Sequence, residues 1–289
     1  MKVWLKELLL MCKLAKKTNS ISCLAFGLFS VIASNSYAEI QLSGSFTQGG
    51  MVVGKTLPNN TVMLNEKEIK VANNGAFVFG FAWNDTTDYT LTVTDKSGQI
   101  EQSTFTPKVR KYKQSNIKGI AKKIMNPAAA DVARSTLDRK QVAAARANVS
   151  DLSFFSQGFI APRTTKITGV YGSQRLFNGK LKSTHYGVDY RGKVGAEVKA
   201  PASGKVVLWV PDMFYSGGTL IIDHGHGVNS TFLHLSDAYV KVGDDVQKND
   251  VIAAVGASGR ATGPHLDWRV NWFGVRLDPQ LVLQALPVK

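Results

Sequence analysis

The segment Gly263-Pro264-His265-Leu266-Asp267-Trp268-Arg269-Val270 places two chemically active side chains, His265 and Asp267, at the start of a strand-like run. Side chains at positions i and i+2 of a β-strand point to the same face, so we expect these two to lie side by side. Pro264 fixes φ and cannot donate to a sheet, which is typical of a loop that leads into the strand. The pair is suited to binding a metal ion or transferring a proton.

Working outward from this segment, all five histidines of the chain lie between positions 185 and 265. His185 and Asp189 stand four residues apart, and His234 lies in an apolar run. A catalytic zinc site uses three protein ligands, commonly His nitrogens and carboxylate oxygens, and keeps a fourth position for water. His185, Asp189 and one residue of the His265/Asp267 pair can supply three ligands. Each element alone is common, and a single His in an apolar strand is more often a core residue, so the ordered series is the informative signal.

This series resembles the lysostaphin/LytM-type zinc endopeptidases of bacterial cell walls. In that family a His-x3-Asp motif, a His on a later strand and a His-x-His motif follow one another. The matching segments here are Thr184–Asp189, Thr231–Leu235 and Gly263–Asp267, the last differing from the family at its final residue. Flanking segments also agree with the family: Ala200–Val206, Ile222–Gly227 and Val242–Val246. The resemblance covers about residues 155–285 and implies a zinc-dependent hydrolase acting on peptide cross-links of peptidoglycan.

The resemblance implies a role for each matching residue. His185 and Asp189 would be zinc ligands, while His234 and His265 would be catalytic histidines that deprotonate the attacking water and stabilise the oxyanion. The family's third ligand is the second His of its His-x-His motif, and Asp267 stands at that position. Carboxylate is an accepted zinc ligand, so we expect Asp267 to be the third ligand. Its negative charge is expected to make the zinc a weaker Lewis acid.

A second hypothesis follows from the same departure at position 267. The site has then lost its metal, and the domain is a non-catalytic cell-wall binder or an activator of another hydrolase, with a regulatory protein as its partner. We favour the active peptidase, because a decayed site has no reason to keep four competent residues while replacing the fifth with another ligand type.

Four further residues are candidates with weaker support. His224 and His226 lie in a Gly-containing stretch that predicts a turn between strands, and His226 is the alternative ligand should Asp267 fail. Glycine-rich loops around 172–184 and 211–218 are expected to line a groove for a flexible peptide. Tyr186 and Tyr215 are candidate substrate contacts, although either could equally be a packing residue.

The rest of the chain predicts a mostly β protein. Residues 39–107 contain short strands separated by turn signals and predict a small antiparallel sandwich-like module. Residues 108–154 form a basic linker, within which 128–148 lack Gly and Pro and predict a helix. Residues 155–289 predict an antiparallel β domain that ends in a short helix beginning at Pro279. The strand-like segments in it are 166–172, 204–210, 219–223, 230–235, 251–255 and 265 to about 276.

Residues 1–38 have the features of a secretory signal peptide. Five lysines accompany an apolar run from 21 to 33, and a small-x-small pattern ends at Ala38. We therefore expect export to the periplasm or cell envelope with a mature start at Glu39; membrane contact is expected only if the leader stays uncleaved as an anchor. Both cysteines, Cys12 and Cys23, lie in this leader, which excludes disulfide and thiolate chemistry from the mature chain.

The chain of 289 residues is strongly basic, with a formal net charge of +14. The leader's five Lys and one Glu account for +4, which leaves +10 for the mature part. A basic exported protein is attracted to anionic polymers such as the cell wall or lipid headgroups. Nucleic acid is the least supported partner, because neither a basic recognition helix nor an interleaved aromatic platform is present.

Overall fold

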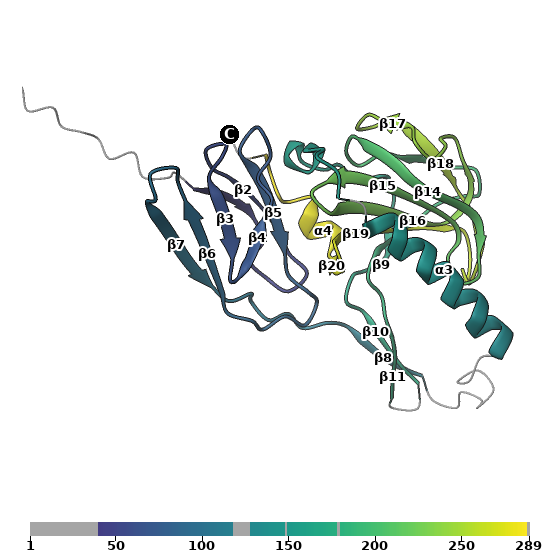
Figure 1. The fold of residues 1–289 in the computed structure, drawn as a ribbon. Coiled ribbons are helices and arrows are strands. Elements are labelled where there is room, and N and C mark those ends of the chain that lie inside the picture. Colours follow the sequence, from purple (N-terminus) through teal and green to yellow (C-terminus); the bar gives the residue numbers. More distant parts are fainter. Residues whose placement is uncertain (1–39, 118–127, 148, 178–179, 288–289) are drawn as a thin grey trace, which may run out of the picture. The chain divides into compact units, whose positions relative to one another are not determined.

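The computed structural model describes residues 40–117, 128–147, 149–177 and 180–287. The predicted signal peptide lies outside the described residues. Antiparallel strands dominate, which confirms the predicted mostly β class (Figure 1). Among the residues described, no helix is long and apolar enough to cross a membrane.

The N-terminal module consists of two antiparallel sheets. One contains β1 (Gln41–Gly44), β2 (Met51–Lys55) and β5 (Ala76–Gly80), and the other has the order β4 (Lys67–Ile69), β3 (Thr61–Leu64), β6 (Tyr89–Thr94) and β7 (Ile100–Phe105). Phe79 is fully buried and packs against Phe46, Phe81 and Phe105, with ring centroids 5.7–6.4 Å apart. This aromatic cluster gives the module an apolar core, as its alternating sequence predicts.

The segment after this module contains one unpredicted element and one predicted element. β8 (Gln114–Ile117) pairs in parallel with β10 (Gln174–Phe177), which forms a hairpin with β11 (Lys180–Thr184). The expectation of a loop across 172–184 was therefore wrong for most of its length, because the chain pairs with itself there. The helix predicted at 128–148 is observed as α3 (Ala129–Ala147). Asp138 of α3 accepts a hydrogen bond from the backbone N–H of Phe214 at 2.8 Å.

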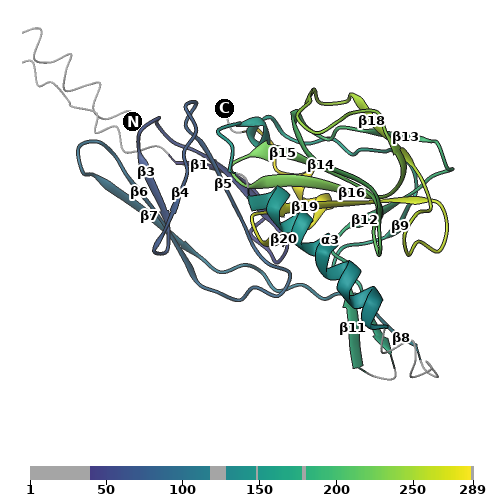
Figure 2. The same ribbon diagram turned by 45° about the vertical axis from the view of Figure 1, so that its right-hand side comes forward.

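The C-terminal region is built on one large antiparallel sheet (Figure 2). Its main strand order is β17-β14-β15-β16-β19-β12-β9, and β13, β18 and β20 pair at its sides. The bounds are β9 (Ile167–Gly169), β12 (Val188–Arg191), β13 (Glu197–Lys199), β14 (Gly204–Met213), β15 (Gly217–Gly225), β16 (Val228–Ala238), β17 (Asp245–Val246), β18 (Val251–Val255), β19 (His265–Trp272) and β20 (Val275–Leu277). A 3-10 turn, η1 (Phe154–Gln157), precedes the sheet.

β19 carries the alternation that the sequence predicts. Leu266, Trp268 and Val270 are 0% exposed and belong to the hydrophobic core. The residues between them therefore share the opposite face of the strand. The sequence predicts a single strand from His265 to about Arg276, and this is wrong in one respect. Phe273 adopts a positive φ of 48°, and the chain turns there into β20.

The chain ends in α4 (Pro279–Val282), which confirms the predicted short helix with Pro279 at its first position. Asp278 caps this helix, because its carboxylate accepts a hydrogen bond from the backbone N–H of Gln280 at 2.9 Å. The capping carboxylate also forms an ion pair with Arg110 at 2.8 Å. Asp278 is 2% exposed, so its charge is buried with its counter-ion.

Candidate active site

The pairing of β12 with β19 brings two carboxylates face to face. Asp189 stands directly opposite Asp267 in the antiparallel register. Like charges at such positions repel, so the arrangement requires a nearby cation. His185, Asp189 and Asp267 each offer a ligand atom, and these atoms lie within 4.8 Å of one another. The structure thus brings together the three residues predicted as metal ligands.

Two glycines make room for these carboxylates. A Cβ atom at Gly187 would lie 2.1 Å from Oδ1 of Asp267, and one at Gly169 would lie 2.1 Å from Oδ2 of Asp189. No side chain fits at either distance without moving a carboxylate.

His185 is the ligand candidate with the clearest unmet bonding capacity. Its Nε2 atom lies 3.2 Å from Oδ1 of Asp189, yet both atoms are buried without a hydrogen-bond partner in the described part of the chain. Its Nδ1 atom lies 4.0 Å from Oδ2 of Asp267. Burial alone would lower the pKa of His185, but the neighbouring carboxylates of Asp189 and Asp267 outweigh it and raise the pKa.

Asp267 forms a bidentate ion pair that the sequence interpretation missed. Arg269 donates from Nε to both carboxylate oxygens at 3.1 Å and from Nη2 to Oδ2 at 2.6 Å. Burial opposes ionisation of Asp267, which is 2% exposed, but the Arg269 charge outweighs burial and holds the pKa of Asp267 well below its usual range. Arg269 follows Asp267 at the next same-face position of β19, so the period of two could have identified it.

His234 and His265 lie next to one another, with ring centroids 4.8 Å apart. Nδ1 of His234 is 2.9 Å from the carbonyl of Ser258, and Nδ1 of His265 is 2.7 Å from the carbonyl of Gly263. A carbonyl can only accept, so each Nδ1 carries the proton and each Nε2 keeps its lone pair. His234 also has a positive φ of 63°, an unfavourable backbone conformation for a residue with a Cβ. Burial lowers the pKa of His234, which favours its neutral form.

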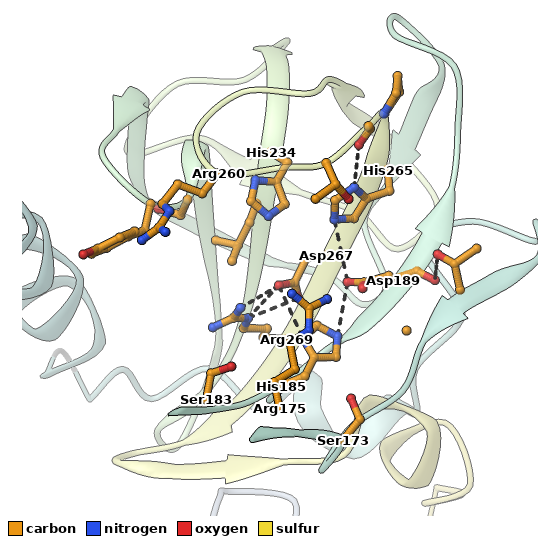
Figure 3. A pocket seen from close by; sticks show the side chains of 18 of the residues that line it. Ser173, Arg175, Ser183, His185, Asp189, His234, Arg260, His265, Asp267 and Arg269 are labelled. Atoms are coloured by element: carbon orange, nitrogen blue, oxygen red, sulfur yellow. Dashed lines mark hydrogen bonds and ion pairs between the residues drawn. The ribbon is translucent and has the colours of Figure 1, made fainter. Parts of the chain in front are cut away.

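These side chains open onto a groove of about 640 Å³ (Figure 3). The groove contains all five predicted metal-binding and catalytic residues together with Arg269. Tyr215 lines it as predicted and stacks under the guanidinium of Arg260 at 4.8 Å. Tyr186 lines a neighbouring pocket instead, where its ring packs 4.3 Å from the guanidinium of Arg276.

The two remaining histidines lie away from the groove. His226 and Gly227 form the two-residue turn between β15 and β16, with φ values of 50° and 81°, as the sequence predicts. The His226 ring packs on Phe155 with centroids 4.9 Å apart and its Nδ1 lies 3.1 Å from the carbonyl of Lys70. His226 is thus not placed to replace Asp267 as a ligand.

Residues 183–279 match the profile of peptidase family M23. This part of the chain is a family M23 peptidase domain. The match begins just before His185 and ends after β20, so the M23 domain includes the three ligand candidates and both groove histidines.

The curated relatives of the M23 domain include cell-wall peptidases. Peptidoglycan DD-endopeptidase ShyB of Vibrio cholerae is 40% identical over 86 residues, which is 30% of this chain and 20% of the relative. Lysostaphin of Staphylococcus simulans is 37% identical over 107 residues, or 36% of this chain and 21% of the relative. The chain thus spans only about a fifth of the length of these relatives.

A solved structure matches a larger part of the chain. The crystal structure of a Pseudomonas aeruginosa protein assigned to peptidase M23 covers 83% of this chain and 96% of its own, with a TM-score of 0.63 and 26% sequence identity. The similarity supports the mostly β fold well beyond the M23 domain itself.

The donor set fits a zinc ion, the metal that the family resemblance implies. One imidazole and two carboxylates are ligand types that zinc accepts. The facing Nε2 of His185 and Oδ1 of Asp189 are both buried and lack hydrogen-bond partners among the described residues. A cation between two acceptors would satisfy both. Asp267 completes the set while sharing its carboxylate with Arg269.

Proposed function

We propose that this protein is a zinc-dependent endopeptidase that hydrolyses peptide cross-links of peptidoglycan in the cell envelope. The observation that carries the proposal is the convergence of His185, Asp189 and Asp267 beside His234 and His265 in one open groove. The names of two relatives, the peptidoglycan DD-endopeptidases ShyB and ShyC, support the same substrate class.

In this proposal His185, Asp189 and Asp267 hold the zinc, which supplies Lewis acidity when bound. Arg269 offsets the extra negative charge that Asp267 brings to the proposed ligand set. A carboxylate paired with a guanidinium has no net charge, so His185, Asp189 and the Asp267–Arg269 pair together carry one negative charge. A set of one carboxylate and two neutral imidazoles carries the same charge. The pairing therefore offsets the loss of Lewis acidity that a second carboxylate would otherwise cause.

His234 and His265 handle protons in this proposal. Their Nδ1 protons are directed to the carbonyls of Ser258 and Gly263, which leaves each Nε2 free to accept a proton. Because burial favours the neutral form of His234, this residue suits a general base at neutral pH. His265 lies near Asp189, with Nε2 and Oδ1 3.9 Å apart; once its Nε2 has accepted a proton, it can donate a hydrogen bond to the carbonyl oxygen that gains charge.

The second candidate function is a non-catalytic binder of peptidoglycan peptides or an activator of another hydrolase. One observation favours it: Arg269 donates to both oxygens of Asp267, and a metal must share that carboxylate with a fixed positive charge. The groove would then bind peptides without cutting them.

Zinc stoichiometry and muropeptide release, measured together on the unmodified protein, Asp267→Ala and Asp267→His, distinguish the two functions. We expect one zinc per chain and release of cross-linked peptides for the unmodified protein, with both lost in Asp267→Ala. A protein without zinc and without activity, in which Asp267→His gains both, would establish the non-catalytic function instead.

Export forms a separate part of the proposal and rests on the leader pattern of residues 1–38. Mass spectrometry of the protein from cell-envelope fractions should give a mature N-terminus at Glu39. An intact leader in that fraction would support a membrane-anchored form and contradict cleavage.

A further inference from the structure

A second pocket, of about 370 Å³, adjoins the groove. It lies between α3 and the sheet, and its lining includes side chains of β16, β19 and β20. Tyr215, Ser216, Leu233 and Arg269 line both the groove and this pocket. A peptide that lies in the groove can therefore extend a side group or a chain end into the pocket.

The pocket carries an excess of positive charge. Four arginines line it, namely Arg139, Arg146, Arg269 and Arg276, against a single carboxylate from Asp138. The Asp138 carboxylate accepts the backbone N–H of Phe214. Arg139 donates to the Ser135 carbonyl of its own helix at 3.1 Å, and the charge of Arg269 is balanced by Asp267. Arg146 and Arg276 remain, and neither forms an ion pair with a carboxylate in the part of the chain that the structure describes.

Arg146 is the side chain with the greatest unmet bonding capacity in this pocket. Its Nη2 donates to Oγ1 of Thr231 at 2.7 Å, while its buried Nε has no hydrogen-bond partner among the described residues. Burial, followed by the charges of Arg276 and Arg269, lowers the pKa of Arg146 to about 9. A half-buried guanidinium beside two others is unfavourable unless an anion joins them.

Arg276 is the second arginine of this pocket without a carboxylate partner, and it packs against Tyr186. Its guanidinium lies 4.3 Å from the centroid of the Tyr186 ring, which is within the range of a cation–π contact. Burial, together with the Arg269 charge, lowers the pKa of Arg276. The pair thus presents a preorganised set of donors at little further cost in side-chain entropy.

A purely structural role for Arg146 explains less. Arg146 lies in the last turn of α3, where a cation interacts favourably with the helix dipole. That interaction is weak at such positions and provides no acceptor for the buried Nε. The Arg146 Nε without a partner is better explained by a ligand that accepts its hydrogen bond.

We propose that this pocket binds a free carboxylate of the peptide that occupies the groove, with Arg146 and Arg276 as its specificity-determining residues. Guanidinium groups bind carboxylates through paired, charge-assisted hydrogen bonds. Stem peptides of peptidoglycan carry free carboxylates, so the proposal deepens the proposed function and rests on it for the identity of the peptide. The pocket would select acidic stem peptides and reject amidated ones.

The test is a titration of full-length protein with an uncross-linked stem tetrapeptide, in its free-acid form and with its carboxylates converted to carboxamides. We expect the free acid to bind about tenfold more tightly, as one charge-assisted contact supplies. Arg146→Gln and Arg276→Gln should each weaken binding of the free acid about tenfold and leave binding of the carboxamide unchanged. Arg134→Gln is the matched control, because Arg134 lies on α3 outside the pocket and pairs with Asp212 at the surface.

Equal affinities for the two peptides in the unmodified protein would overturn the proposal, and so would a carboxylate preference that survives in both pocket variants. If neither variant folds, the ratio of the affinities of the unmodified protein for the two peptides tests the proposal by itself. Muropeptide release is measured in parallel. Release without carboxylate preference overturns the pocket and leaves the endopeptidase proposal standing, whereas carboxylate preference without release supports the pocket and contradicts the endopeptidase.

Discussion

The histidine of the core and the histidines of the groove differ in how their ring nitrogens are bonded. His224 is 0% exposed, and its Nδ1 and Nε2 lie 2.8 Å from the Ser203 carbonyl and 2.9 Å from the Ser230 hydroxyl. His185, by contrast, has a buried Nε2 without a hydrogen-bond partner among the described residues. Of these two histidines, only the one in the groove has a ring nitrogen whose bonding capacity the fold leaves unused, so it is the one available to a ligand.

The largest effect that follows from this comparison is the loss of zinc on removal of a groove histidine. His185→Ala should lose bound zinc and peptidase activity altogether, because it removes one of three proposed ligands. Metal analysis and muropeptide release check this outcome.

His224→Ala is the matched variant from the core. It should keep one zinc per chain yet lower the free energy of unfolding by about 2–4 kcal/mol, since it leaves a cavity and removes two buried hydrogen bonds. Denaturant unfolding measures the change. Loss of zinc in a folded His224→Ala protein would break the distinction between the two kinds of histidine.

His234→Gln tests a groove histidine that we do not expect to bind metal. We expect kcat to fall by roughly 10²–10⁴-fold, the usual contribution of a general base, with zinc content unchanged. Metal analysis combined with steady-state kinetics separates the two effects. Loss of zinc would make His234 a ligand instead of a base.

Arg269→Met extends the comparison from histidines to a carboxylate, because it removes the partner of Asp267. Removing the guanidinium leaves Asp267 buried without its partner, so the zinc-free protein should be less stable by about 3–5 kcal/mol. Zinc should restore much of this loss, because the metal replaces the missing cation.

Arg134→Met provides the control for Arg269→Met. Its ion pair with Asp212 is exposed, and such pairs contribute about 0–1 kcal/mol. Urea unfolding with and without a chelator measures both variants. Equal losses in the two variants would show that the Asp267–Arg269 pair is unimportant.

The last effect concerns acid stability. Burial lowers the pKa of His224 to about 4, below the value of roughly 6.5 for an unfolded chain. Between these values the unfolded state binds more protons, so the stabilisation present above pH 6.5 declines as the pH falls towards 4, by about 3 kcal/mol in all. His224→Gln should flatten the stability curve across this window, as measured by urea unfolding at several pH values. An unchanged slope would assign the acid sensitivity to another group.

Much of the site could be anticipated because it depends on local rules. The period of two along β19 and the family motif indicated that His265, Asp267 and His185 belong together, and the structure brings them together; their roles stay predictions. The Asp267–Arg269 pair was not predicted, because only metal-binding residue types were considered on this face of β19. Arg269 is the next residue on the same face.

Long-range pairing was harder to predict. β8 joins β10 in parallel across about 60 residues, and no local pattern in Gln114–Ile117 indicates that partner. The break in β19 at Phe273 was missed for a similar reason, because an aromatic residue in a β-like run seldom adopts a positive φ. The division of the chain at 107 and 154 remains a prediction.

The glycines at 169 and 187 have a consequence for anyone who builds such a centre elsewhere. Each lies where a methyl group would come within 2.1 Å of a carboxylate oxygen. Copying only the three ligands onto another antiparallel sheet would therefore place two acids against side chains and push them out of position. A transplanted centre needs five positions, two of which contribute only empty space.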